Sequence, residues 1–133
     1  MVKKNPKQFF RGDVFYCLLK KNGGGIQEDV HPVLIIQNDF ANTNSTTLIV
    51  AAVTRNLKKP KCPTHVKIKY EDLLEPTINK EIVGSIVQFE HVYTVNKEDM
   101  GEYVASIHLN QLEYMQAQGI SFGWIRAEER RIS

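Results

Sequence analysis

The sequence contains few cysteines and no long hydrophobic run, and both shortages restrict its class. Cys17 and Cys62 are the only cysteines among 133 residues, which excludes a disulfide-rich secreted scaffold. We interpret them as free thiols rather than as a disulfide or as zinc ligands. No apolar run approaches the roughly 20 residues of a membrane-spanning helix, and the basic residues 1–7 lead into no signal-peptide core. We therefore expect a cytoplasmic protein without a membrane partner.

Acidic residues are scarce in the first half of the chain, and basic residues are scarce in the second. Twelve Lys and Arg but only four Asp and Glu precede Tyr70, a net charge of +8. From Tyr70 onward, five Lys and Arg stand against eleven Asp and Glu, a net charge of −6. Gathered on one surface, the basic residues would attract phosphate. Alternatively, folding mixes the two halves and leaves no basic patch.

Short segments rich in β-branched and aromatic residues follow one another along most of the chain. They predict strands at 12–20, 30–38, 46–54, 64–70, 85–89 and 91–95, with a turn over 97–101. Continuous apolar runs at 33–36 and 48–53 indicate strands covered on both faces. A helix is predicted over 109–118. We expect a mainly β (α+β) fold, a small bent barrel of five to seven strands with a C-terminal helix, as one domain over 11–133 that follows a flexible basic arm at 1–10.

Four motifs occur in order: Arg-Gly-Asp-Val-Phe-Tyr at 11–16, Val-His-Pro-Val-Leu-Ile-Ile-Gln-Asn-Asp at 30–39, Ile-Val-Ala-Ala-Val-Thr at 49–54 and Pro-Thr-His-Val-Lys-Ile at 63–68. Together they resemble the MazF/PemK toxin family, from about Arg11 to Asp99. The resemblance implies an SH3-like barrel that forms a homodimer and needs no metal or other cofactor. It also implies cleavage of single-stranded mRNA by attack of a ribose 2′-hydroxyl on the adjacent phosphate, inhibition by a cognate antitoxin, and DNA binding through the antitoxin complex.

The resemblance places the catalytic pair at His31 and Thr54. The family has an arginine before its Pro-Val-Leu-Ile strand, where this chain has His31, and Thr54 matches the threonine that ends the next strand. Arginine stays charged and binds phosphate bidentately, whereas histidine titrates near neutrality and can transfer a proton. We expect His31 to act as an acid–base group or phosphate ligand, and Thr54 to donate its hydroxyl to a phosphate oxygen. The alternative is that His31 is a surface histidine and cleavage is crippled.

Further polar residues are candidates for RNA binding: Gln27, Asn38, Arg55, Asn56, Glu90 and His91. Arg55 and Asn56 directly follow Thr54 and would hold a phosphate or contact a base edge. Gln27 and Asn38 would bond to bases, unless each caps a turn. Glu90 and His91 occupy positions of a family Glu-Gln-x-Arg run. His65 is expected on a solvated strand face.

The sequence thus favours a metal-independent endoribonuclease toxin neutralised by an antitoxin. A catalytically degenerate module that binds RNA or antitoxin is the alternative, because the family arginine is His31 here. An SH3-like protein adaptor is a third reading, and it predicts no salt-dependent RNA binding. Loss of cleavage in His31→Ala would support the enzyme, whereas activity created only by His31→Arg would indicate the degenerate relative.

Overall fold

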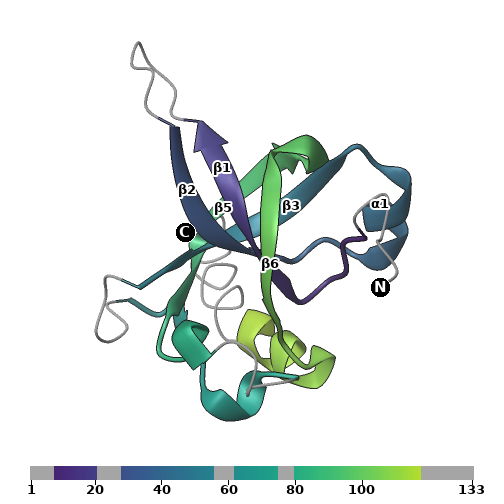
Figure 1. Cartoon of the computed structure of the whole chain (residues 1–133). Helices are drawn as coiled ribbons and strands as arrows, with labels where there is room; N and C mark the ends of the chain where they lie inside the picture. Colours follow the sequence, from purple (N-terminus) through teal and green to yellow (C-terminus); the bar gives the residue numbers. More distant parts are fainter. Residues whose placement is uncertain (1–7, 21–27, 56–61, 75–79, 118–133) are drawn as a thin grey trace, which may run out of the picture.

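In the computed structural model, residues 8–20, 28–55, 62–74 and 80–117 are described. They form an antiparallel sheet in the strand order β4-β5-β3-β2-β1-β6 (Figure 1). The strands are β1 Asp13–Lys20, β2 Glu28–Ile35, β3 Thr47–Thr54, β4 His65–Lys67, β5 Ile86–Asn96 and β6 Met100–Ser106. The helices are α1 Asp39–Asn44, a C-terminal helix over 109–117, and the short 3-10 helices η1 Tyr70–Asp72, η2 Lys80–Ile82 and η3 Lys97–Asp99.

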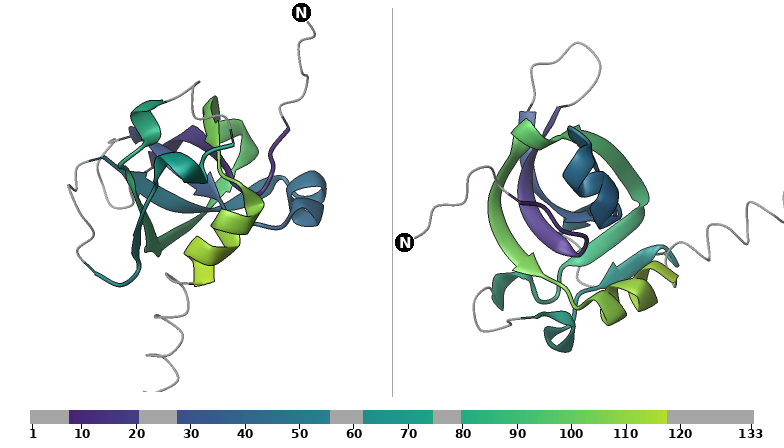
Figure 2. Two further views of the ribbon diagram at one scale, coloured as in Figure 1. Left: turned by 90° about the horizontal axis from the view of Figure 1, so that it is seen from below. Right: turned by 90° about the vertical axis from the view of Figure 1, so that its right-hand side faces the viewer.

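The sheet curls strongly without closing. Its two edges are β4 and β6, and Figure 2 shows the strands bent into a ring with α1 over one opening. Beyond these edge strands, Leu73 and Ile107 form an isolated antiparallel bridge that draws the following segments together. The prediction of a mainly β fold with a C-terminal helix is confirmed, and the expected barrel is this curled, open sheet.

Apolar side chains cover both sides of the central strands. Val33 and Leu34 are neighbours on β2, so their side chains point to opposite sides of the sheet. Leu34 joins one buried cluster together with Leu112 and Met115 of the C-terminal helix, and Val33 joins a second cluster around Phe15. Both β2 residues are fully buried, which confirms the strand covered on two faces that its continuous apolar run predicts.

Gly12 makes the tight turn into β1 and fixes where this strand begins. Its φ is +96°, a region that side chains disfavour. Its N–H donates to the Ile35 carbonyl at 2.8 Å, and its own carbonyl accepts from the Ile107 N–H at 2.9 Å. A Cβ at this position would lie 3.0 Å from the Ile107 oxygen. Glycine is therefore required here by both conformation and space.

Several predicted strands differ from the structure. The sequence predicted no strand at β6, whose seven residues include Gly101 and show no regular alternation of buried and exposed positions. A Cβ on Gly101 would lie 3.3 Å from the Tyr16 oxygen, so this glycine allows β6 to approach β1 closely. The strands predicted at 85–89 and 91–95 are one continuous strand, β5. β2 begins and ends earlier than the predicted 30–38.

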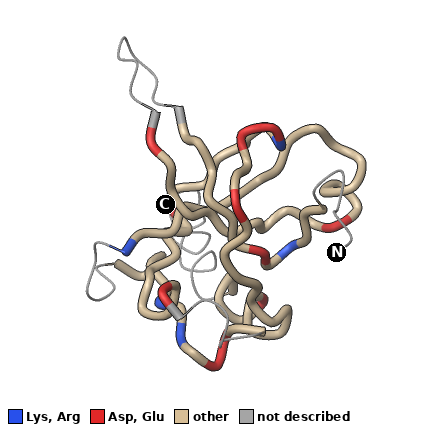
Figure 3. The backbone as a smooth tube through the Cα atoms, in the orientation of Figure 1, with Lys and Arg blue, Asp and Glu red and all other residues tan. Residues whose placement is uncertain are grey.

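Charged residues of both signs are spread over the described part of the chain (Figure 3). Seven of the twelve Lys and Arg that precede Tyr70 lie outside the described residues, so the choice between a basic patch and mixed halves stays a prediction. Residues 1–7 of the expected arm lie outside the described residues, while the Phe9 ring packs on Phe15 with centroids 5.0 Å apart. Within the described residues, every helix is too short or too polar to cross a membrane.

Candidate functional site

His31 and Thr54 lie on neighbouring strands, at the place where these strands part. The β2–β3 ladder ends with the pair Val33 and Ala52. Two residues further along each strand come His31 and Thr54, which share the side of the sheet with that last pair because alternate residues point the same way. Beyond the pair, β2 and β3 diverge (Figure 1). We call this place where the two strands part, with His31, Thr54 and the following Arg55, the fork.

The fork presents an accessible imidazole beside a carboxylate. The His31 side chain is 48% exposed, and its Nε2 lies 3.9 Å from Asp29 Oδ2. Its backbone is held by pairing with Cys17 of β1. Pro32 follows, and it has no N–H to donate to a neighbouring strand, just where the β2–β3 ladder stops. His31 therefore sits on a fixed backbone with its ring free to reach a bound molecule.

Arg55 brings a positive charge directly after Thr54. Its Nη2 donates to the Tyr16 hydroxyl at 2.7 Å, and its Nη1 lies 3.6 Å from Glu81 Oε2. The side chain remains 42% exposed. Tyr16 pairs with Pro32 of β2, so this hydrogen bond links the end of β3 to β1 past β2. Tyr16 points to the opposite side of the sheet from His31, because it alternates with Cys17, the partner of His31. The guanidinium is therefore held at the end of β3 on that opposite side, where it stays partly exposed.

A bulge in β5 turns Glu90 toward β4. The β3–β5 ladder skips residues 89–91, which lie between Gln88, the partner of Ala52, and Val92. Bulges of this kind redirect side chains and are frequent near functional sites. Glu90 thereby faces β4 instead of continuing the ladder with β3.

The Glu90 carboxylate is already well supplied with donors. Its Oε1 accepts from the Thr64 hydroxyl at 2.7 Å, and its Oε2 lies 2.6 Å from His65 Nε2 and 3.6 Å from His91 Nε2. Partial burial raises the pKa of Glu90. Hydrogen bonds from Thr64, the backbone and His65, together with the charge of His65, lower it by more. The pKa of Glu90 therefore lies below its usual value. His91 itself is 51% exposed. Glu90 is thus an anion held by its neighbours.

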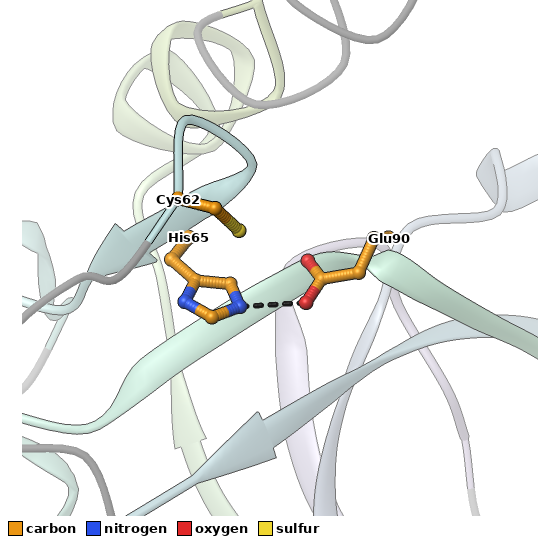
Figure 4. A group of neighbouring side chains, drawn as sticks. All are labelled: Cys62, His65 and Glu90. Carbon is orange, nitrogen blue, oxygen red and sulfur yellow. Dashed lines mark hydrogen bonds and ion pairs between the residues drawn. The ribbon is translucent and has the colours of Figure 1, made fainter.

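His65 was expected on a solvated face, and this prediction is wrong: its side chain is only 7% exposed. It belongs to a turn in which the His65 N–H donates to the Cys62 carbonyl at 3.0 Å. Figure 4 shows the Cys62 thiol, the His65 ring and the Glu90 carboxylate facing one another. Both cysteines are free thiols, as predicted. The spacing Cys-x-x-His was the available sequence signal for this group, and our interpretation of the cysteines overlooked it.

Three residues that were predicted to bind RNA remain: Asn38, Gln27 and Asn56. Asn38 lies past the far end of β2 from His31, where its Oδ1 accepts from the Ala41 N–H at 2.9 Å and caps α1. The capping alternative therefore describes Asn38. Gln27 and Asn56 fall outside the described residues.

Known proteins resemble this chain over most of its length. The chain matches the family of PemK-like, MazF-like toxins of type II toxin–antitoxin systems over residues 10–118. It is 36% identical over 114 residues to a protein named endoribonuclease MazF from Staphylococcus epidermidis, covering 85% of this chain and 90% of that relative. It is also 36% identical over 97 residues to endoribonuclease EndoA of Bacillus subtilis, covering 73% of this chain and 78% of that protein.

Solved structures show the same fold at low identity. An endoribonuclease from mycobacterial species superposes with a TM-score of 0.64 at 18% identity, covering 89% of this chain and 93% of its own. A MazE–MazF structure from Deinococcus radiodurans gives 0.63 at 14% identity, covering 87% and 96%. With a family match across most of its length and relatives above one-third identity, the chain belongs to the PemK-like, MazF-like toxins of type II toxin–antitoxin systems.

Proposed function

We propose that this protein is an endoribonuclease toxin that cleaves single-stranded mRNA without a metal ion, by attack of a ribose 2′-hydroxyl on the adjacent phosphate. Family membership and relatives named endoribonucleases support the activity. The observation that supports the mechanism is the strand register: the β2–β3 ladder ends at Val33 and Ala52, and His31 and Thr54 follow two residues later on the same side of the sheet. An imidazole and a hydroxyl at one place are suited to proton transfer and to hydrogen bonding with a phosphate.

The nucleophile in this reaction belongs to the RNA, so the protein has to move protons and stabilise charge. His31 accepts the proton of the 2′-hydroxyl or donates one to the departing 5′-oxygen, and solvent water takes part in the other transfer. Thr54 donates its hydroxyl to a non-bridging phosphate oxygen, and Arg55 adds positive charge at the end of the same strand. The O2′–P bond forms as the P–O5′ bond breaks. The products carry a 2′,3′-cyclic phosphate and a free 5′-hydroxyl.

Residues around the fork supply the proposed RNA contacts. Arg55 and His91 are exposed enough to meet the backbone or a base. Glu90 is an anion, so it would accept a hydrogen bond from a base amino group rather than contact a phosphate. Gln27 and Asn56 remain proposed contacts on sequence grounds. Asn38 is left out, because its side-chain oxygen caps α1.

A second protein is the proposed inhibitor. Solved structures of similar fold include an endoribonuclease in complex with its cognate antitoxin and a MazE–MazF structure. We propose that this toxin, as a homodimer in the cytoplasm, is neutralised by an antitoxin with an acidic tail. The basic residues at 55–61 and 67–69 of the sequence suit such a tail. DNA binding would belong to the toxin–antitoxin complex.

One observation favours the degenerate binding module as a second candidate. His31 replaces a permanently charged arginine, and the Asp29 carboxylate lies 3.9 Å from its ring. A carboxylate there opposes the approach of a phosphate unless His31 is protonated. A degenerate module of this kind would still bind RNA or antitoxin, but it would cleave RNA slowly or not at all. The variant His31→Arg separates the two candidates, because a degenerate module would gain cleavage from it.

The experiment that tests the proposed function uses the purified full-length chain and a long unstructured RNA. Mapping of the 5′ ends identifies the cleaved linkage, which is then placed in a short oligonucleotide. We expect 5′-hydroxyl and 2′,3′-cyclic phosphate ends, unchanged rates in EDTA, and no cleavage when the nucleotide before the cut carries a 2′-deoxyribose. Cleavage of the deoxy-substituted oligonucleotide would contradict the mechanism.

A further inference from the structure

A second group of reactive side chains lies beside the fork. Gln88 of β5 pairs on one side with Ala52 of β3 and on the other with His65 of β4. Since neighbouring strands are about 4.8 Å apart, His65 lies roughly 10 Å from Ala52 across the sheet. Cys62 and Glu90 complete the group from the turn before β4 and from the β5 bulge (Figure 4).

The three side chains bring different metal-binding atoms together. The Cys62 Sγ, a His65 ring nitrogen and a Glu90 carboxylate oxygen all lie within 4.8 Å of one another. In a tetrahedral zinc site, with bonds of about 2.0 to 2.3 Å, the ligand atoms are roughly 3.5 Å apart. His65 Nε2 and Glu90 Oε2 are 2.6 Å apart. These two atoms would have to move about 1 Å further apart to share a tetrahedral ion.

Turn and strand pairing position two of the three proposed ligands before any ion binds. The 62–65 turn is closed by the hydrogen bond from His65 to the Cys62 carbonyl, and Pro63 stands at its second position, which proline favours. The antiparallel pairing of His65 with Gln88 places Glu90 as the diagonal neighbour of His65. The His65 side chain is nearly buried, so its ring has few other orientations. Two ligands of the set are therefore fixed by secondary structure.

The Thr64 hydroxyl contacts two of the three proposed ligands. Its hydroxyl oxygen lies 3.1 Å from Cys62 Sγ and donates to Glu90 Oε1 at 2.7 Å. Hydrogen bonds of this kind orient the groups that bind a metal and raise its affinity. A metal ion binds the thiolate form of a cysteine and the unprotonated nitrogen of an imidazole, so binding is expected to release protons.

We propose that Cys62, His65 and Glu90 bind a zinc ion through thiolate sulfur, imidazole nitrogen and carboxylate oxygen. A thiolate with an imidazole selects Zn²⁺ over Mg²⁺ and Ca²⁺, which prefer oxygen ligands. Three protein ligands leave a fourth position for water, and His91 is the nearest further imidazole, 3.6 Å from Glu90. No bond-breaking step of the proposed RNA cleavage uses this ion. Glu90 is also a proposed contact to a base, so zinc binding is tested in the absence of RNA.

The test is metal titration of the full-length, tag-free protein without RNA. We expect one Zn²⁺ per chain by calorimetry, and Co²⁺ should give a thiolate-to-metal charge-transfer absorption at the same stoichiometry. Cys62→Ser, at an exposed position, should lose this absorption and bind Zn²⁺ at least ~10-fold more weakly. His108→Gln removes an exposed histidine elsewhere and should bind as the unmodified chain does.

Glu90→Gln provides a second variant, with circular dichroism as the check of folding, and it should weaken Zn²⁺ binding in the folded protein. The proposal is overturned if the unmodified chain binds no Zn²⁺, if Co²⁺ binds without the charge-transfer absorption, or if Cys62→Ser binds both ions unchanged. Since binding is measured without RNA, a failure here leaves the cleavage mechanism standing, and a failure of cleavage leaves this site standing.

Discussion

Arg55 Nη2 donates a hydrogen bond to the Tyr16 hydroxyl at 2.7 Å, which ties the residue after Thr54 to β1. A mobile arginine would lose conformational entropy on binding a phosphate. Held by Tyr16 and lying near Glu81, this guanidinium has already lost part of that freedom. The contact therefore prepares the fork for an anionic ligand.

Arg55→Ala should weaken RNA binding about tenfold at low salt, because one charged contact to phosphate is lost. The slope of log affinity against log salt should fall by about 1. Fluorescence anisotropy with a labelled oligonucleotide, bound to a protein made inactive by Thr54→Val, measures both. Lys69→Ala removes the same charge from an exposed residue outside the fork and should change the affinity less. Equal effects of the two substitutions would show that Arg55 acts only through net charge.

Gly12 and Gly84 offer a matched test of how the turn into β1 is built. Both have positive φ, +96° and +93°, so alanine is strained at either position by roughly 1–2 kcal/mol. Only at Gly12 would the new Cβ also meet a backbone atom, the Ile107 oxygen at 3.0 Å. Urea denaturation should therefore show a larger loss of unfolding free energy for Gly12→Ala than for Gly84→Ala. The reverse order would mean that the turn adjusts easily.

The two cysteines should differ sharply in reactivity. Burial, with the nearby Asp99 charge, raises the pKa of the Cys17 thiol to about 11, whereas Cys62 is exposed. Since the thiolate is the reacting form, iodoacetamide at pH 8 should label the folded chain once and the urea-unfolded chain twice, as read by intact mass. In Cys62→Ser the folded protein should stay unlabelled. Rapid double labelling of the folded chain would contradict the burial of Cys17.

Acid should remove the stabilisation provided by Glu90. Its pKa is lower in the folded chain than its ordinary value of 4.5, so its contribution to stability is present above that value and is lost as the pH falls toward the folded pKa. Glu90→Gln should therefore be less stable than the unmodified chain at pH 7, and the difference should shrink below about pH 4. Thermal unfolding across this pH range measures it. Glu98→Gln, at an exposed position of η3, is the control for the loss of one carboxylate outside this hydrogen-bond network.

The strands of the sheet centre could be predicted because their residues carry strong local signals. Val33 and Leu34 lie in an apolar run that can only be buried on two faces, and the structure buries both. β6 carries no comparable signal, since Gly101 and Glu102 interrupt its apolar residues. It forms a strand because it pairs with β1. This pairing depends on how the whole chain folds and not on the local sequence of β6.

In the candidate site, too, residues with local sequence signals could be predicted, whereas contacts that depend on the whole fold could not. The placement of His31 and Thr54 depends on two local motifs and the register between them, which sequence motifs can indicate. The contact of His65 with Glu90 joins residues 25 positions apart and depends on the β5 bulge. The alternation at 64–70 placed His65 on the outer face of its strand, but it could not show that Glu90 and the 62–65 turn would cover the ring.

The central claim is that His31 and Thr54 act on one phosphate. The most direct test is a double-mutant cycle, in which kcat/KM on the mapped oligonucleotide is measured for His31→Ala, Thr54→Val and both together, with His31→Arg alongside. We predict losses of about 10²–10⁴-fold for His31→Ala, and a double variant little worse than the more damaging single one, because both residues serve the same transition state. Full activity of His31→Ala, or an inactive natural chain that gains cleavage only as His31→Arg, would contradict the account.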